Sequence, residues 1–183
     1  TPWWSSTRLK EQFDIKKKRD IKNNIFMNLD FINIYNNLVN LSRNKNLFSY
    51  FTKRDTFSDR LLIFLFHLAF FFRYFKSKVD KKYLQDFYDY VFRQIELDIR
   101  ELGYGDQSVN KKMKTYVNLL YSIINKIDKW NEYNNIQKID IFNFYIENKD
   151  NNEKFLDYFE KYSNYLSKIT LNSFTKSVRE HKF

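Results

Sequence analysis

Apolar residues recur at three- and four-residue steps along most of this 183-residue chain, which is the spacing of one face of an α-helix. The pattern begins at Ile21 and predicts a first helix on Ile25, Phe26, Leu29, Ile32 and Val39. A short helix with Leu47, Phe48 and Phe51 is expected next. Residues 1–20 have no such stripe, and we expect them to form a mobile basic N-terminal arm containing Lys16, Lys17, Lys18 and Arg19.

The most apolar segment runs from Leu61 to Phe72 and is interrupted only by His67. Thr56 and Asp59 precede it with the spacing of a helix capping box. Twelve helical residues rise about 18 Å, well short of the roughly 30 Å hydrocarbon core of a bilayer. Because Arg60 and Arg73 also bracket the segment, it is interpreted as a buried central helix and not as a membrane span.

Two long helices are predicted to meet at the only glycines of the chain. Asp80 is expected to cap the first helix, whose inward stripe is Leu84, Phe87, Val91, Ile95, Ile99 and Leu102. Gly103 supplies the left-handed residue that ends it, and Gly105, Asp106 and Ser108 form the connection, with Ser108 or Asp106 as the next cap. The second helix presents Val109, Met113, Tyr116, Val117, Leu120, Ile124 and Ile127.

Two further helices are predicted at about 136–147 and 152–170, and a short terminal one contains Phe174 and Val178. Only two glycines and one proline occur, too few for the turns of a β-rich fold of this length. The sequence therefore predicts an all-α fold, a single-domain helical bundle of about six to eight helices over residues 21–183.

Residue types that carry chemistry are sparse. The chain has no cysteine, and neither His67 nor His181 has a second histidine near it, so we expect no metal site. Ser58, Asp59 and His67 are the residue types of a hydrolase triad, but no glycine-framed nucleophile turn accompanies them. His67 is instead interpreted as a core histidine that hydrogen-bonds a neighbour. We expect no catalytic residues, no cofactor and no enzymatic activity.

Positive charge is concentrated in two places. Residues 1–54 hold eleven Lys/Arg against four Asp/Glu, and residues 107–129 hold five against one. Lys111, Lys112 and Lys114 lie in the first turns of a predicted helix, where the helix dipole disfavours cations. These lysines and the cluster Lys16–Arg19 are candidate contacts for a polyanion, either lipid headgroups or RNA; abundant surface lysine is the competing interpretation.

The run from Asp98 through Arg100, Glu101, Gly103 and Gly105 to Asp106, followed by a lysine-rich helix, resembles the signature of the ubiquinol–cytochrome c chaperone family. Asp59, Arg60, His67 and Arg73 in their apolar run also resemble that family's leading core helix. The resemblance spans roughly residues 35–130, and Tyr104 departs from it, because a small aliphatic residue is expected there.

The resemblance implies a helical chaperone that binds newly made cytochrome b and promotes biogenesis of the cytochrome bc complex. It also implies work near the ribosome and its rRNA. The basic face suits peripheral contact with an anionic membrane, and the protein acts either alone or with a small helical co-chaperone. We expect a bacterial cytoplasmic location at the inner membrane, because Glu11, Asp14 and Asp20 are unlike a transit peptide; the mitochondrial matrix is the alternative.

Two other functions compete with this interpretation. A basic helical nucleic-acid-binding protein would use the Gly103–Gly105 corner as a helix-turn-helix, but the flanking helices are expected to be longer than that motif uses. A small helical enzyme acting on lipids has no metal or nucleophile constellation to support it.

Overall fold

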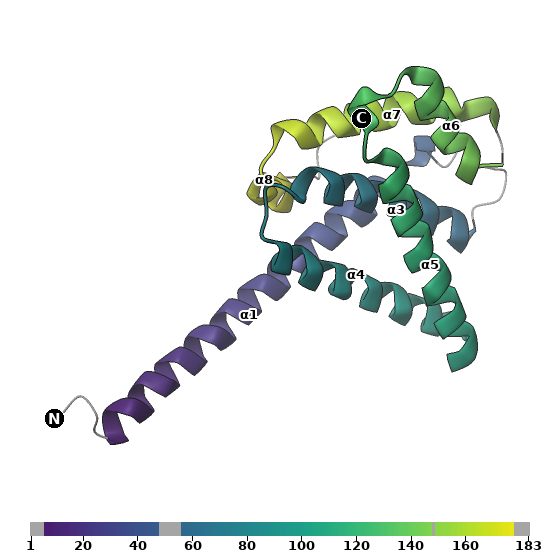
Figure 1. Cartoon of the computed structure of the whole chain (residues 1–183). Helices are drawn as coiled ribbons and strands as arrows, with labels where there is room; N and C mark the ends of the chain where they lie inside the picture. The colour runs from purple at the N-terminus through teal and green to yellow at the C-terminus, as the bar shows by residue number, and fades with distance from the viewer. Residues whose placement is uncertain (1–5, 48–55, 148, 178–183) are drawn as a thin grey trace.

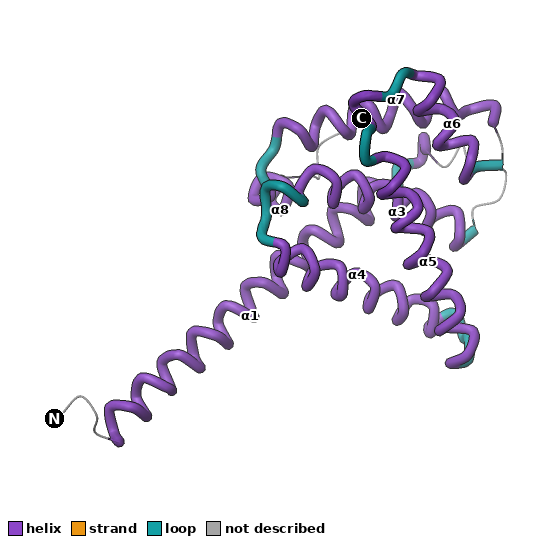
Figure 2. Tube along the Cα trace, viewed as in Figure 1, coloured by secondary structure: helices purple, strands orange, loops and turns teal. Residues whose placement is uncertain are grey.

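The computed structural model describes residues 6–47, 56–147 and 149–177; the side chains of 6–16, 24, 26 and 177 lie outside that description. The all-α prediction is confirmed, since these ranges form seven α-helices, a further helical stretch at residues 45–47 and two short 3₁₀ helices, and contain no β-strand (Figure 2). The helices are α1 (Ser6–Ser42), α3 (Phe57–Phe75), α4 (Lys81–Glu101), α5 (Asp106–Ile127), α6 (Asn135–Tyr145), α7 (Asn152–Lys168) and α8 (Leu171–Ser177). The 3₁₀ helices are η1 (Trp130–Glu132) and η2 (Lys149–Asn151).

Helix α3 is the centre of the fold. It packs against α5, α1 and α7, so a helix that is apolar on nearly every side finds a neighbour on nearly every side. The predicted capping box at its start is confirmed: the Asp59 amide donates to Thr56 Oγ1 at 3.2 Å, and the Thr56 amide donates to Asp59 Oδ2 at 3.4 Å. Within the described ranges, no helix is both long and apolar enough to cross a membrane.

Aromatic side chains fill the space between α3, η1, α6 and α7. The Phe70 ring lies 4.9 Å from the Trp130 ring, edge to face, and is stacked 5.3 Å from the Phe159 ring. Phe66 lies 5.4 Å from Phe142 and 5.6 Å from Phe159. Edge-to-face and offset contacts at these separations are the favoured aromatic geometries. They fix α7 over the centre of α3.

Helix α1 begins at Ser6, so the expectation that the helix starts at Ile21 is wrong. Residues 6–20 contain no proline or glycine and many good helix formers, and the helix continues through them even though they lack an apolar stripe. Figure 1 shows this N-terminal half extending away from the other helices. The mobility of residues 1–20 stays a prediction, and residues 1–5 lie outside the described ranges.

The buried face of α1 also differs from the residues that indicated the helix. Ile25, Leu29 and Ile32 are exposed, whereas the buried side chains belong to its C-terminal half: Phe31, Ile34, Leu38 and Leu41. Asn37 is buried with them and donates from Nδ2 to the Phe174 carbonyl at 2.8 Å, which joins α1 to α8. Packing of α1 is therefore confined to the half that lies against α3, α4 and α8.

The other predicted helices are confirmed with small shifts of their ends. Asp80 caps α4 as expected, its carboxylate accepting the Tyr83 amide at 3.3 Å. The inward stripe of α4 is correct except for Leu102, which is 54% exposed because it follows the last turn of the helix. The short helix predicted around Leu47 is helical at residues 45–47, while Phe48, Phe51 and Val178 lie outside the described ranges.

Candidate functional site

The corner between α4 and α5 has the backbone that the glycines predict. Gly103 has φ +90°, the left-handed conformation that favours glycine, and its amide donates to the Arg100 carbonyl at 2.9 Å. A Cβ built on Gly103 would meet no atom within 4 Å, so backbone conformation alone accounts for glycine there. The corner turns α5 back across α3 and α4.

The expected cap of α5 is wrong. Gly105 is the N-cap residue, and no side chain caps this helix end; Asp106 and Ser108 are already inside the helix and exposed. Asp106 is instead paired with Arg100, whose NH1 lies 2.5 Å from Asp106 Oδ1 and whose Nε lies 3.0 Å from Glu96 Oε1. The guanidinium therefore bridges the end of α4 to the start of α5, and the Asp106 carboxylate is used in that bridge.

The lysines after the corner form an exposed basic face on α5. Lys111 and Lys114 are exposed, and Lys112 is half-buried with Nζ 4.5 Å from the centre of the Tyr104 ring. A shallow hollow of about 330 Å³ is lined by Ser108, Lys111, Lys112, Thr115 and Tyr116. This surface therefore combines the lysine ammonium groups with the Tyr104 ring and with the hydroxyl groups of Ser108 and Thr115.

The second basic cluster lies elsewhere. Lys17, Lys18 and Arg19 are exposed on the projecting half of α1, and the Lys16 side chain lies outside the described residues. Figure 1 places this half of α1 and the start of α5 at opposite sides of the molecule. The two clusters are therefore separate surfaces.

The residues expected as a family core motif are spread over several places. Asp59 serves the capping box of α3, and Arg60 lines a cleft that is described below. Arg73 donates from Nε to the Asp128 carbonyl at 3.2 Å, which ties the end of α3 to the end of α5. Arg100 crosses the corner, and Glu101 is exposed at the end of α4.

His67 is fully buried in α3 and has partners at both ring nitrogens. Nδ1 lies 2.8 Å from the Ile63 carbonyl, which can only accept, so Nδ1 carries the proton. Nε2 then accepts from the Tyr158 hydroxyl at 2.7 Å. Burial lowers the pKa of His67 to about 4, so the ring is neutral at pH 7. The described residues contain no group of three or more His, Asp or Glu side chains that could hold a metal ion.

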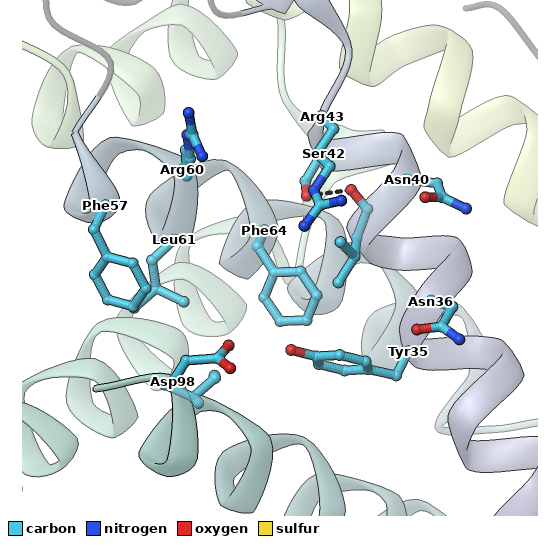
Figure 3. A pocket seen from close by; sticks show the side chains of 12 residues that line it. Tyr35, Asn36, Asn40, Ser42, Arg43, Phe57, Arg60, Leu61, Phe64 and Asp98 are labelled. Atoms are coloured by element: carbon cyan, nitrogen blue, oxygen red, sulfur yellow. Dashed lines mark hydrogen bonds between the residues drawn. The ribbon is translucent and has the colours of Figure 1, made fainter. Parts of the chain in front are cut away.

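A cleft of about 580 Å³ opens where α1, α3 and α4 meet (Figure 3). Its apolar lining includes Val39 from α1, Phe57, Leu61 and Phe64 from α3, and Ile95 from α4. Its polar lining combines two arginines, one carboxylate, one phenol and small polar groups: Arg43, Arg60, Asp98, Tyr35, Asn36, Asn40 and Ser42.

Asp98 and Tyr35 face one another across the cleft, from α4 and α1 respectively (Figure 3). Burial raises the pKa of Tyr35 to about 12, and the Asp98 carboxylate adds to that rise. Burial and the nearby Glu101 carboxylate raise the pKa of Asp98, and Arg43 and the Tyr35 hydroxyl oppose that rise. The cleft thus holds the Asp98 carboxylate and the Arg43 guanidinium beside apolar lining residues.

Sequence reasoning did not single out this cleft. Of its polar groups only Arg60 was a candidate residue, and Asp98 was quoted solely as the start of the corner motif. Tyr35 and Arg43 lie more than fifty positions before Asp98, so no local spacing could have joined them. The one available signal was polar residues interrupting the apolar faces of α1 and α4.

The expected family resemblance is confirmed: residues 49–133 match the family described as ubiquinol-cytochrome C chaperone. The matched segment is just under half of the chain and includes α3, α4, the corner, α5 and η1. It contains the α3 and α4 sides of the cleft, whereas the α1 side precedes it. Comparisons with curated proteins and with solved structures gave no match. The family match indicates a chaperone that assists assembly of the ubiquinol–cytochrome c complex.

Proposed function

We propose that this protein is an assembly chaperone of the cytochrome bc complex that binds newly made cytochrome b. The observation that carries the proposal is the family match over residues 49–133, which spans the central helix and the corner. Its action is binding and release, with no catalytic step and no cofactor.

The cleft between α1, α3 and α4 is the client site in this proposal. A membrane protein that has not yet been inserted exposes apolar helices, and these need an apolar surface away from water. The half-buried Val39 and Phe57 supply the accessible apolar part of the lining, with Leu61, Phe64 and Ile95 buried behind them. The space of about 580 Å³ accommodates several side chains of one helical turn. Arg43 and Asp98 at the edge would pair with polar groups that flank the apolar segment.

The finer features of the proposal concern partners and place. Exposed Lys111 and Lys114, with Lys112, would contact ribosomal RNA while the client is being made. Peripheral contact with an anionic membrane and a small helical co-chaperone complete the set of partners. The proposed location is the bacterial cytoplasm at the inner membrane, with the inner-membrane side of the mitochondrial matrix as the alternative.

The corner does not favour the nucleic-acid-binding alternative. Helices α4 and α5 have 21 and 22 residues, far longer than the short pair of a helix-turn-helix motif. Gly103 and the Arg100 bridge shape this corner so that α5 packs onto α3. The buried residues of α5, among them Val109 and Tyr116, form the inward face of that helix.

The client site is tested by crosslinking from inside the cleft. A photo-crosslinking residue at Asn36 or Asn40, both exposed and lining the cleft, should react with cytochrome b that is synthesised in the presence of the protein. The matched control carries the same residue at Asn118, which is exposed on α5 and lines none of the hollows described above. Reaction only from the cleft positions is expected. Equal reaction from Asn118, or co-purification of cytochrome b without any cleft crosslink, would place the client elsewhere.

A further inference from the structure

The middle of α1 carries an apolar stripe that no other part of the described structure covers. Ile21, Ile25, Leu29 and Ile32 are 50%, 55%, 51% and 40% exposed. At about 100° per residue these four side chains fall within an arc of about 80°, along roughly 17 Å of helix. Large aliphatic side chains aligned in this way indicate a partner, because single exposed ones would be scattered.

Lysines lie on and beside this stripe. On the same helical projection Lys18 lies within the arc, Lys22 just beyond one edge and Lys17 about 40° beyond the other. All three are exposed. The acidic residues of this stretch, Asp20 and Asp30, point to other sides of the helix, about 100° and 180° from Ile21.

We infer that the middle of α1, residues 17–32, lies along an anionic lipid surface, with the stripe Ile21–Ile32 in the acyl boundary and the lysines at the phosphates. An amphipathic helix with an aliphatic face and flanking lysines binds in the plane of a bilayer interface in this way. The inference deepens the proposed function, on which it rests, because it assigns the peripheral membrane contact to this surface and not to the lysines of α5.

Charge and shape favour lipid over the other occupants of such a face. A second copy of the helix packed in parallel would bring Lys18 and Lys22 of both copies against one another, which is unfavourable. A nucleic-acid backbone would pair with the lysines but would leave Ile21, Ile25 and Leu29 in water. A bilayer interface satisfies both kinds of side chain. Because α1 extends from the body on the N-terminal side of this stripe (Figure 1), a flat surface can approach it from that side.

Co-sedimentation of the full chain with vesicles tests the inference. The vesicles contain phosphatidylcholine alone or phosphatidylcholine with phosphatidylglycerol, and the salt concentration is varied. Wild type should bind the anionic vesicles, and raising the salt should weaken binding. Ile21→Gln with Ile25→Gln should lower binding at least about tenfold. The matched control, Leu97→Gln with Ile136→Gln, changes two other exposed aliphatic residues and should bind as wild type does.

Charge variants separate the two basic surfaces. Lys17, Lys18 and Lys22 changed together to Gln should reduce anionic-vesicle binding at least about tenfold and flatten its salt dependence. Changing Lys111, Lys112 and Lys114 to Gln should leave vesicle binding within about twofold of wild type. The reverse ranking would move the lipid contact to α5 and overturn the inference.

Three other results would also overturn it. A dimer that the Ile21→Gln, Ile25→Gln protein no longer forms would identify a second copy as the occupant. Binding of RNA but not of anionic vesicles by α1 would identify a nucleic acid. If vesicle binding is absent while crosslinks from Asn36 and Asn40 to cytochrome b persist, the inference of a lipid contact on α1 is wrong. The proposal that the cleft binds cytochrome b is then unaffected.

Discussion

Phe70→Ala is expected to destabilise the protein by roughly 3–5 kcal/mol, the range for removing a fully buried phenylalanine. Phe70 has no exposed surface, and its ring contacts Trp130 of η1 and both Phe159 and Tyr162 of α7. Its loss would leave a cavity where three elements meet the central helix. Urea denaturation followed by circular dichroism measures the change as a lower midpoint at an unchanged slope.

The control is another phenylalanine in a different environment. Phe144 is 66% exposed on α6, and Phe144→Ala should cost about 1 kcal/mol or less, mainly the contact of its ring with Lys126 Nζ. Phe70→Leu keeps most of the volume and should lose about 1–2 kcal/mol, which provides a folded variant if alanine is not tolerated. Equal losses at Phe70 and Phe144 would contradict the placement of α3 at the centre of the core.

Acidification should remove stability that His67 provides while it is neutral. Its pKa is lowered to about 4 by burial, whereas an unfolded histidine titrates near 6.5. Between these values the unfolded state binds more protons, so the free energy of unfolding falls as pH falls from about 6.5 to about 4. The loss should reach roughly 3 kcal/mol by pH 4, and no change from this group is expected above pH 7.

The His67 contribution is measured against a variant that has no titratable group at this position. His67→Gln loses stability at pH 7, because a glutamine cannot reproduce both hydrogen bonds, to Ile63 and to Tyr158. Since carboxylates titrate in both proteins, the difference in unfolding free energy between wild type and variant isolates His67. That difference should shrink by roughly 3 kcal/mol from pH 6.5 to pH 4. A constant difference would mean that His67 is not buried in its neutral form.

Local chemistry in the sequence predicted the ends of several helices. Thr56 with Asp59, Asp80, and Gly103 each act through atoms within a few residues, and each is found in the expected role. The cap of α5 was misjudged for a tertiary reason, since Arg100 engages the Asp106 carboxylate from the preceding helix. Short-range patterns do not reveal which of two partners a carboxylate will take.

Periodicity showed which residues share a helix face but not which face is covered. Ile25, Leu29 and Ile32 gave the first helix its signal, yet Ile34 and Leu38, about a third to half a turn away around the helix, are the ones buried. The cleft could not be predicted from periodicity for the same reason. Tyr35, Arg60 and Asp98 line one cleft only when three helices pack together. By contrast, the apolar run Leu61–Phe72 was correctly placed, because a helix that is apolar on all sides must be central.

The central claim is that the protein is a chaperone whose client is cytochrome b. The most direct measurement is co-purification of the tagged full chain with cytochrome b made in a cell-free translation, beside an unrelated membrane protein of equal length and mean hydropathy. We expect cytochrome b to be retained several-fold more than the unrelated protein. Equal retention of both membrane proteins, or retention of nucleic acid without cytochrome b, would contradict the claim.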